Sequence, residues 1–228
     1  MALQPRLFAQ EHILDVAVIN IPPEIVINPD TQQVTGTVAT AARAMAQKCR
    51  AKINFIVSPA WSRAFRLAVD GTADAVVPTI ESAERSKFLF FPKNPVVRSE
   101  MGLIAMKSDG HKSFTGFAML DNKRIGRIAG GLIAPEFDTY LHENEITVSR
   151  QHSYFSLFKS LVAKRVDFVV GNQASYLHFA NELNIADEIQ LLMPVIHSVP
   201  QYLALSRAAL ANHPERNTLY ECLFTATL

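Results

Sequence analysis

Arg85 and the polar loop before it carry the clearest chemical signal in this sequence. The segment from Gly71 to Arg85 reads GTADAVVPTIESAER: a helix end, a short apolar strand and a polar loop. Ligands collect where the strands of an α/β sheet end, and the loop there offers the Thr79 hydroxyl, the backbone at Ile80 and the Arg85 guanidinium. Because a guanidinium holds a carboxylate through two parallel hydrogen bonds, this segment predicts half of an anion-binding site.

The composition indicates a folded globular protein. The chain has 228 residues, 49% of them hydrophobic and 19% charged, with a net charge of +1. These values argue against disorder and against a nucleic-acid partner. No apolar run is long enough to span a bilayer, and the first residues, MALQP, lack the apolar region of a signal peptide. We therefore expect a soluble chain.

The hydrophobic pattern alternates between the periods of strands and helices. Such alternation predicts an α/β fold with mainly parallel sheets flanked by helices. The proline-rich segment 20–36 is expected to be a functional loop. Strands are expected at 13–19, 53–57, 73–77, 101–106, 124–129, 146–149, 166–170 and 199–205, and helices at 37–50, 61–70, 134–142, 154–163, 174–183 and 214–228.

The order of these motifs resembles the periplasmic solute-binding proteins of amino-acid ABC importers. The chain runs from a helix through Gly-x-x-Asp and an apolar strand to Ser/Thr-x-x-Arg and then Phe-Pro, here Ser82 to Arg85 and Phe91-Pro92. The resemblance implies a type II fold in which a two-strand hinge joins two α/β lobes and the ligand lies between them. It places lobe 1 at 1–98, lobe 2 at 99–199 and a return to lobe 1 at 200–228.

In this family an arginine at the position of Arg85 binds the ligand carboxylate. The alternative for Arg85 is a surface ion pair with Glu81 or Glu84. Thr79 is expected either to hydrogen-bond the ligand or to cap its own turn. Trp61 matches a tryptophan that is common at the start of this helix, and it either lines the cleft or packs under the sheet.

The second lobe is expected to contribute a glycine turn and a helix start. The segment Gly130-Gly131-Leu132 offers free backbone amides, which favour an anion, although Gly131 and Leu132 replace the hydroxyl residues usual in the family. Asn172 stands where the family has an aspartate for the α-ammonium group. Glu24 stands where an aromatic residue is common, and it is expected to be either a substitute acidic partner or a solvated loop residue.

The cysteines and histidines suggest neither a metal nor a cofactor. Cys49 lies on an apolar helix face, which favours a buried, unpaired residue. A disulfide with Cys222 is the alternative, because both cysteines map to lobe 1 and an oxidising compartment would permit it. The seven histidines show no metal-binding spacing.

The expected function is to bind a small carboxylate-bearing solute, an amino acid or organic acid, by hinge closure. The resemblance implies a monomeric, extracytoplasmic protein whose export signal has been removed and whose partner is the membrane permease of an ABC importer. A second hypothesis is a sensor or degenerate binding module that signals to a partner protein. A third is a dehydratase-type enzyme in which Glu81 or Glu84 acts as general acid.

Overall fold

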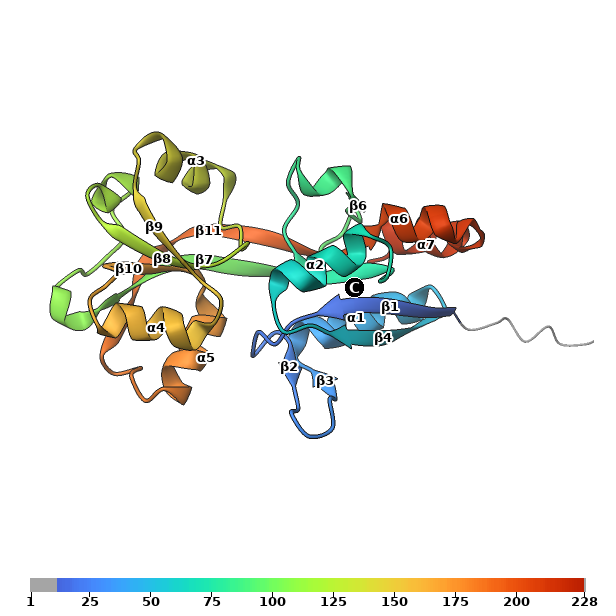
Figure 1. Cartoon of the computed structure of the whole chain (residues 1–228), viewed down its shortest axis with the longest axis horizontal. Coiled ribbons are helices and arrows are strands. Elements are labelled where there is room, and N and C mark those ends of the chain that lie inside the picture. The colour runs from blue at the N-terminus through green and yellow to red at the C-terminus, as the bar shows by residue number, and fades with distance from the viewer. Residues whose placement is uncertain (1–11, 228) are drawn as a thin grey trace, which may run out of the picture.

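In the computed structural model, which describes residues 12–227, two α/β lobes lie side by side along two long strands. These strands, β7 (Val97–Met106) and β11 (Ile189–Ser206), run antiparallel and pass from one lobe into the other (Figure 1). The strand order is β4-β1-β5-β11-β7-β10-β8-β9, and β6 also pairs with β11. A hinge made of two crossing strands is therefore present.

Lobe 1 is built on β1, which pairs in parallel with both β4 and β5. The C-terminal part of β11 runs antiparallel to β5, and two helices close the lobe after it. The elements of this lobe are β1 (His12–Val18), β2 (Val26–Ile27), β3 (Val34–Thr35), α1 (Thr37–Lys48), β4 (Ala51–Val57), α2 (Trp61–Val69), β5 (Ala75–Thr79), the 3-10 turn η1 (Arg85–Lys87), β6 (Leu89–Phe90), α6 (Arg207–Asn212), the 3-10 turn η4 (Pro214–Arg216) and α7 (Asn217–Thr225).

Lobe 2 repeats the pattern around β8, which pairs in parallel with β9 and β10. Its elements are the 3-10 turns η2 (Lys107–Asp109) and η3 (Phe117–Leu120), then β8 (Arg124–Ile128), α3 (Pro135–Glu143), β9 (Thr147–Gln151), α4 (Tyr154–Val162), β10 (Phe168–Asn172) and α5 (Gln173–Glu182). The parallel α/β arrangement that the periodicity predicts is confirmed in both halves.

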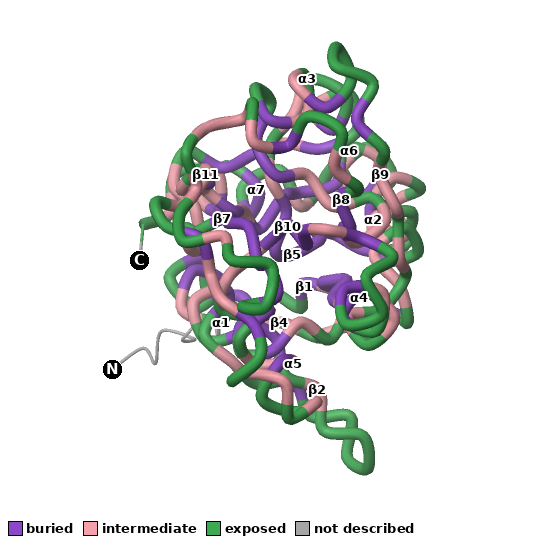
Figure 2. The backbone as a smooth tube through the Cα atoms, turned by 90° about the vertical axis from the view of Figure 1, so that its left-hand side faces the viewer, coloured by how far each residue is buried: buried purple, intermediate pink, exposed green. Residues whose placement is uncertain are grey.

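Apolar residues pack on both faces of the lobe 2 sheet. Successive residues of β10 point to opposite faces, so Phe168 and Val170 join the cluster around Phe137 of α3, while Val169 joins the cluster around Phe158 of α4. Figure 2 shows the same arrangement along the molecule, with buried backbone concentrated in the central strands and exposed backbone at the periphery. Burial on both faces explains why β10 begins as a continuous apolar run, Phe168-Val169-Val170.

Three details differ from the sequence-based expectations. Strand β11 begins at Ile189 rather than at 199, because its first half pairs with β7 before an irregularity between Leu192 and His197. The expected closing helix at 214–228 is instead a 3-10 turn at Pro214–Arg216 followed by α7, and a further helix, α6, precedes them. The expected loop at 20–36 contains the small hairpin of β2 and β3.

Cys49 and Cys222 form a disulfide, so the expectation of an unpaired Cys49 is wrong. Cys49 caps the end of α1 and Cys222 lies on α7, which returns to lobe 1 at the end of the chain. The two helices meet only in the folded lobe, and 173 positions separate the two cysteines. No local pattern therefore predicts this pair.

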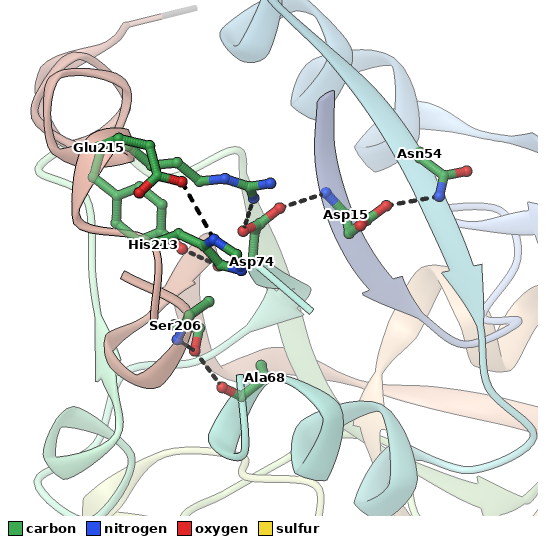
Figure 3. Close-up of polar contacts among 10 residues, drawn as sticks. Asp15, Asn54, Ala68, Asp74, Ser206, His213 and Glu215 are labelled. Atoms are coloured by element: carbon green, nitrogen blue, oxygen red, sulfur yellow. Dashed lines mark hydrogen bonds and ion pairs between the residues drawn. The ribbon is translucent and has the colours of Figure 1, made fainter. Parts of the chain in front are cut away.

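Asp74 connects the C-terminal segment, residues 206–227, to the sheet of lobe 1 through hydrogen bonds and an ion pair (Figure 3). Its carboxylate accepts a hydrogen bond from the Asp15 backbone at 2.8 Å and forms an ion pair with Arg216. Its backbone carbonyl accepts hydrogen bonds from the Ser206 amide at 2.7 Å and from the Tyr220 hydroxyl at 3.0 Å. The buried Asp74 thus joins β1 and β5 to the segment that follows β11.

We predict that Asp74→Asn lowers the free energy of unfolding by about 2–3 kcal/mol, because it leaves Arg216 without its carboxylate partner. The loss is expected at the lower end for a buried ion pair, since 27% of the Arg216 side chain remains exposed. Urea denaturation of Asp74→Asn beside the exposed control Asp30→Asn measures it. Equal stability of the two variants would contradict the role given to Asp74.

Candidate functional site

The residues that the sequence singles out line one cleft of about 680 Å³ between the two lobes. Lobe 1 contributes the segment after β1, the start of α2 and the loop after β5, and lobe 2 contributes the turn after β8 and the end of β10. The predicted residues found in the lining are Glu24, Trp61, Thr79, Ile80, Arg85, Gly130, Gly131, Leu132 and Asn172.

Arg85 turns its side chain inward and is only 8% exposed. Its Nη1 donates to the Thr79 hydroxyl at 3.0 Å and to the Ile80 carbonyl at 2.9 Å, and its Nη2 donates to the Gly130 carbonyl at 3.0 Å. A guanidinium has five N–H donors. The Nε–H group and one Nη2–H group therefore have no acceptor among residues 12–227.

Two aromatic rings lie beside the Arg85 guanidinium, and the group remains protonated although it is buried. The centre of its guanidinium lies 5.1 Å from the Trp61 ring centroid and 5.7 Å from that of Phe65. Burial lowers the Arg85 pKa to about 10, against the opposing charges of Glu84 and Asp138, so the group stays cationic at neutral pH. A buried, stacked and charged arginine with unused donors is suited to binding an anion.

The hydrogen bonds of Arg85 do not include the surface ion pair with Glu81 or Glu84 that the sequence left as an alternative, and its role in ligand binding stays a prediction. They go to Thr79, Ile80 and Gly130, and the neighbouring Glu81 and Glu84 are exposed on the loop. The Thr79 hydroxyl is buried and positions Arg85 instead of capping its own turn. Trp61 both lines the cleft and packs against the lobe 1 cluster of Ala64 and Ala68.

The glycine turn of lobe 2 differs from the expected helix start. Helix α3 begins at Pro135, and the Gly131 amide donates to the Ile128 carbonyl at 3.2 Å. The helix start is therefore not at this turn, and the Gly131 amide is not free; that Gly130, Gly131 and Leu132 contact a ligand stays a prediction. The turn instead presents a carbonyl, that of Gly130, which receives Arg85 across the cleft.

Arg127 and Asp138 hold this turn, and sequence reasoning missed both. Arg127 is buried on β8, forms an ion pair with Asp138 and donates to the Gly131 carbonyl. The other Asp138 oxygen accepts from the Ile133 amide at 3.4 Å. A charged residue inside a short strand reads as a solvated position, and β8 also begins with an arginine, Arg124, so the sequence gives no signal that Arg127 is buried.

Glu24 lies in the cleft and is not a solvated loop residue, since it is only 6% exposed. Its Oε1 accepts from the Ser99 hydroxyl at 2.7 Å and from the Asn172 side-chain amide at 2.5 Å. The second carboxylate oxygen, Oε2, receives no hydrogen bond from the part of the chain that the structure describes. Glu24 is thus the acidic group of the cleft, and Asn172 is its direct partner.

Glu24 makes the stability of the protein depend on pH. Burial raises the Glu24 pKa above its ordinary value, while the hydrogen bonds from Ser99 and Asn172 partly oppose this rise. A carboxyl whose pKa is higher in the folded than in the unfolded protein stabilises the fold below the unfolded pKa, and this contribution disappears as pH rises through the folded pKa.

We therefore expect Glu24→Gln to be more stable than the wild type at neutral pH and to lose this advantage near pH 4. The reason is that glutamine removes the cost of ionising a buried carboxyl. Chemical denaturation of both proteins between pH 4 and pH 8 measures the difference, and a constant difference across this range would contradict the assignment.

The lobe 2 wall of the cleft also contains Tyr154 and Ser175. Tyr154 stacks on Phe179 at 4.3 Å between ring centroids. The buried Ser175 hydroxyl has no hydrogen-bond partner of good geometry among the described residues. The wall therefore combines aromatic surface with a buried hydroxyl behind it.

Neither a metal centre nor a membrane-spanning helix is found in residues 12–227. No group of three or more His, Cys, Asp or Glu side chains in this range is placed to hold a metal ion. None of the helices in the same range is long and apolar enough to cross a bilayer.

Comparison with known proteins identifies the fold. No family model matches the sequence, and no curated protein sequence matches it. Solved structures do match. The GluR0 ligand-binding core from Nostoc punctiforme in complex with L-glutamate is 20% identical, with a TM-score of 0.69, over 92% of this chain and 91% of the other.

Two further structures show the same likeness. The arginine-bound form of ArgBP from T. maritima is 17% identical, with a TM-score of 0.71, over 93% of each chain. A histidine kinase sensor domain with similarity to periplasmic binding proteins is 15% identical, with a TM-score of 0.74, over 93% of this chain and 90% of the other. The chain therefore has the type II periplasmic-binding-protein fold, which confirms the fold that the sequence motifs predict.

Proposed function

We propose that the chain binds a small carboxylate-bearing ligand between its lobes and that Arg85 is the anchor. The observation that carries this proposal is the geometry of Arg85, which is buried at the cleft, fixed by Thr79 and Ile80, and left with two unused N–H donors. A carboxylate is the planar acceptor that such a donor pair fits.

Closure of the hinge is the proposed mechanism. A ligand on Arg85 in lobe 1 contacts the turn after β8 and the Tyr154 wall of lobe 2 only when the lobes are together. These contacts stabilise the closed form relative to the open one, because a ligand shifts an equilibrium only through its different affinity for the two states.

Two roles are compatible with ligand-driven closure. In the first, the protein is a monomeric, extracytoplasmic solute-binding protein that delivers an amino acid or organic acid to an ABC permease. The disulfide supports this role, because disulfides persist in oxidising compartments. In the second, the chain is a sensor module, which the likeness to a histidine kinase sensor domain supports. Ligand-dependent binding to a permease or to a sensor protein distinguishes the two.

The dehydratase hypothesis has weaker support. Glu81 and Glu84 are exposed, and the nearest side-chain interaction of Glu81 is with the Ser86 hydroxyl at 3.5 Å. Turnover of a prephenate-like acid would revive this hypothesis.

A thermal-shift screen tests the binding function. Amino acids, 2-oxo acids, dicarboxylates and aromatic acids are compared with the primary amides of the same compounds. An acid present at a hundredfold excess over its Kd stabilises the folded protein by about 2.7 kcal/mol, and its amide is expected to give no shift. Equal shifts with acid and amide, or no shift with any acid, would contradict a carboxylate-binding cleft.

A further inference from the structure

A chain of hydrogen bonds among buried and half-buried side chains joins the two lobes in the cleft. It starts at Gln201 on β11, whose side-chain amide donates to the Ser99 hydroxyl of β7 at 2.5 Å. Ser99 donates to Glu24 of lobe 1 at 2.7 Å, and Asn172 of lobe 2 donates to the same Glu24 oxygen at 2.5 Å. The chain therefore connects both hinge strands, lobe 1 and lobe 2.

The position of Asn172 requires an amide. Its Oδ1 accepts from the Ala174 backbone at 3.0 Å and caps α5, while its Nδ2 donates to Glu24. An aspartate at this position would cap the helix equally well. In its ionised form, however, it would have no hydrogen to donate and would place a second carboxylate against that of Glu24.

We infer that Glu24 and Asn172 form a latch that sets the balance between the closed and open arrangements of the lobes. Rotation of lobe 2 away from lobe 1 separates the two residues, because Glu24 belongs to the segment after β1 and Asn172 ends β10. Breaking the bond leaves the carboxylate with one fewer donor. The latch therefore favours closure whatever ligand enters the cleft.

The latch differs from the other polar contact between the lobes. Arg85 reaches the Gly130 carbonyl with the same guanidinium that faces the ligand, so ligand binding changes that contact. In the latch, Glu24 Oε1 is held by Ser99 and Asn172, and Oε2 remains available. Since apparent affinity scales with the population of the closed form, the latch sets affinity in addition to the direct contacts.

The decisive variant is Asn172→Asp, studied at a pH above the pKa values of both carboxyls, where it keeps the helix cap and removes the latch; at lower pH the two carboxyls would share a proton and keep a hydrogen bond. We expect it to lower the ratio of closed to open protein roughly 10- to 100-fold, the effect of losing one buried hydrogen bond to a charged group. Small-angle X-ray scattering then gives a larger radius of gyration than in the wild type. The matched control is Asn181→Asp, which makes the same change of charge at an exposed position of α5, away from Glu24, and is expected to stay compact.

The double variant Glu24→Gln/Asn172→Asp separates the latch from general damage to the fold. It exchanges donor and acceptor, so it should restore the bond and the wild-type radius of gyration, with cooperative unfolding in all variants. A radius unchanged by Asn172→Asp would overturn the inference. So would a double variant that is as open, or as poorly folded, as Asn172→Asp alone.

Discussion

Arg85→Ala is expected to lower the affinity for the bound carboxylate about 100-fold or more. The substitution removes a buried cation that lines the cleft and has two unused N–H donors, and truncating one partner of a buried charge pair costs about 2–5 kcal/mol. Arg85→Lys keeps the charge and loses the paired donors, so its affinity is expected to lie between those of the wild type and the alanine variant. Isothermal titration calorimetry with the acid found in the screen measures all three.

A matched control is available in the same lobe. Arg207 also stacks on an aromatic ring, that of Phe90 at 3.9 Å, and donates to the Ser86 carbonyl at 3.1 Å. It does not belong to the cleft lining. Arg207→Ala should therefore bind with wild-type affinity, and a comparable loss in both variants would attribute the effect of Arg85 to the packing of lobe 1.

Removal of the Cys49–Cys222 disulfide is expected to have the largest effect on stability. A cross-link between residues 173 apart restricts the unfolded chain strongly. The double variant Cys49→Ser/Cys222→Ser should therefore lose about 4–5 kcal/mol of unfolding free energy on the chain-entropy account. For a chain of this size the melting temperature should fall by roughly 10–15 °C.

The reduced wild-type protein serves as the control for this prediction. Differential scanning calorimetry should give similar melting temperatures for the reduced protein and the serine variant, both well below that of the oxidised protein. Neither cysteine lines the cleft, so ligand affinity measured below the transition should be unchanged. Equal melting temperatures in the oxidised and reduced states would refute a stabilising role for the bond.

Local patterns predicted most of the fold. The two halves of alternating strands and helices and the fold class follow from periodicity and from glycine at a helix end. Gly71, with φ of +81°, ends α2 as predicted. The boundaries of the lobes remain a prediction. The strand expected at 199–205 is longer in the structure, because β11 begins at Ile189. Its first half contains Pro194 and an irregular pairing with β7, so it lacks the pattern typical of a strand.

The contacts of the candidate site that lie within one sequence motif could be predicted from the sequence. Contacts between residues far apart in the sequence could not. Arg85 and Thr79 lie six positions apart, and their order is visible in the sequence. Glu24 and Asn172 are 148 positions apart, and their hydrogen bond exists only when the two lobes meet. The disulfide and the pairing of Arg216 with Asp74 arise in the same way, from a C-terminal segment that returns to lobe 1.

The crystal structure of the protein with the best acid from the screen tests the central claim most directly. The account predicts that the ligand lies between the lobes and that its carboxylate accepts hydrogen bonds from Arg85 Nε and Nη2 at about 2.7–2.9 Å. A ligand outside this cleft, or one whose carboxylate points away from Arg85, would contradict it.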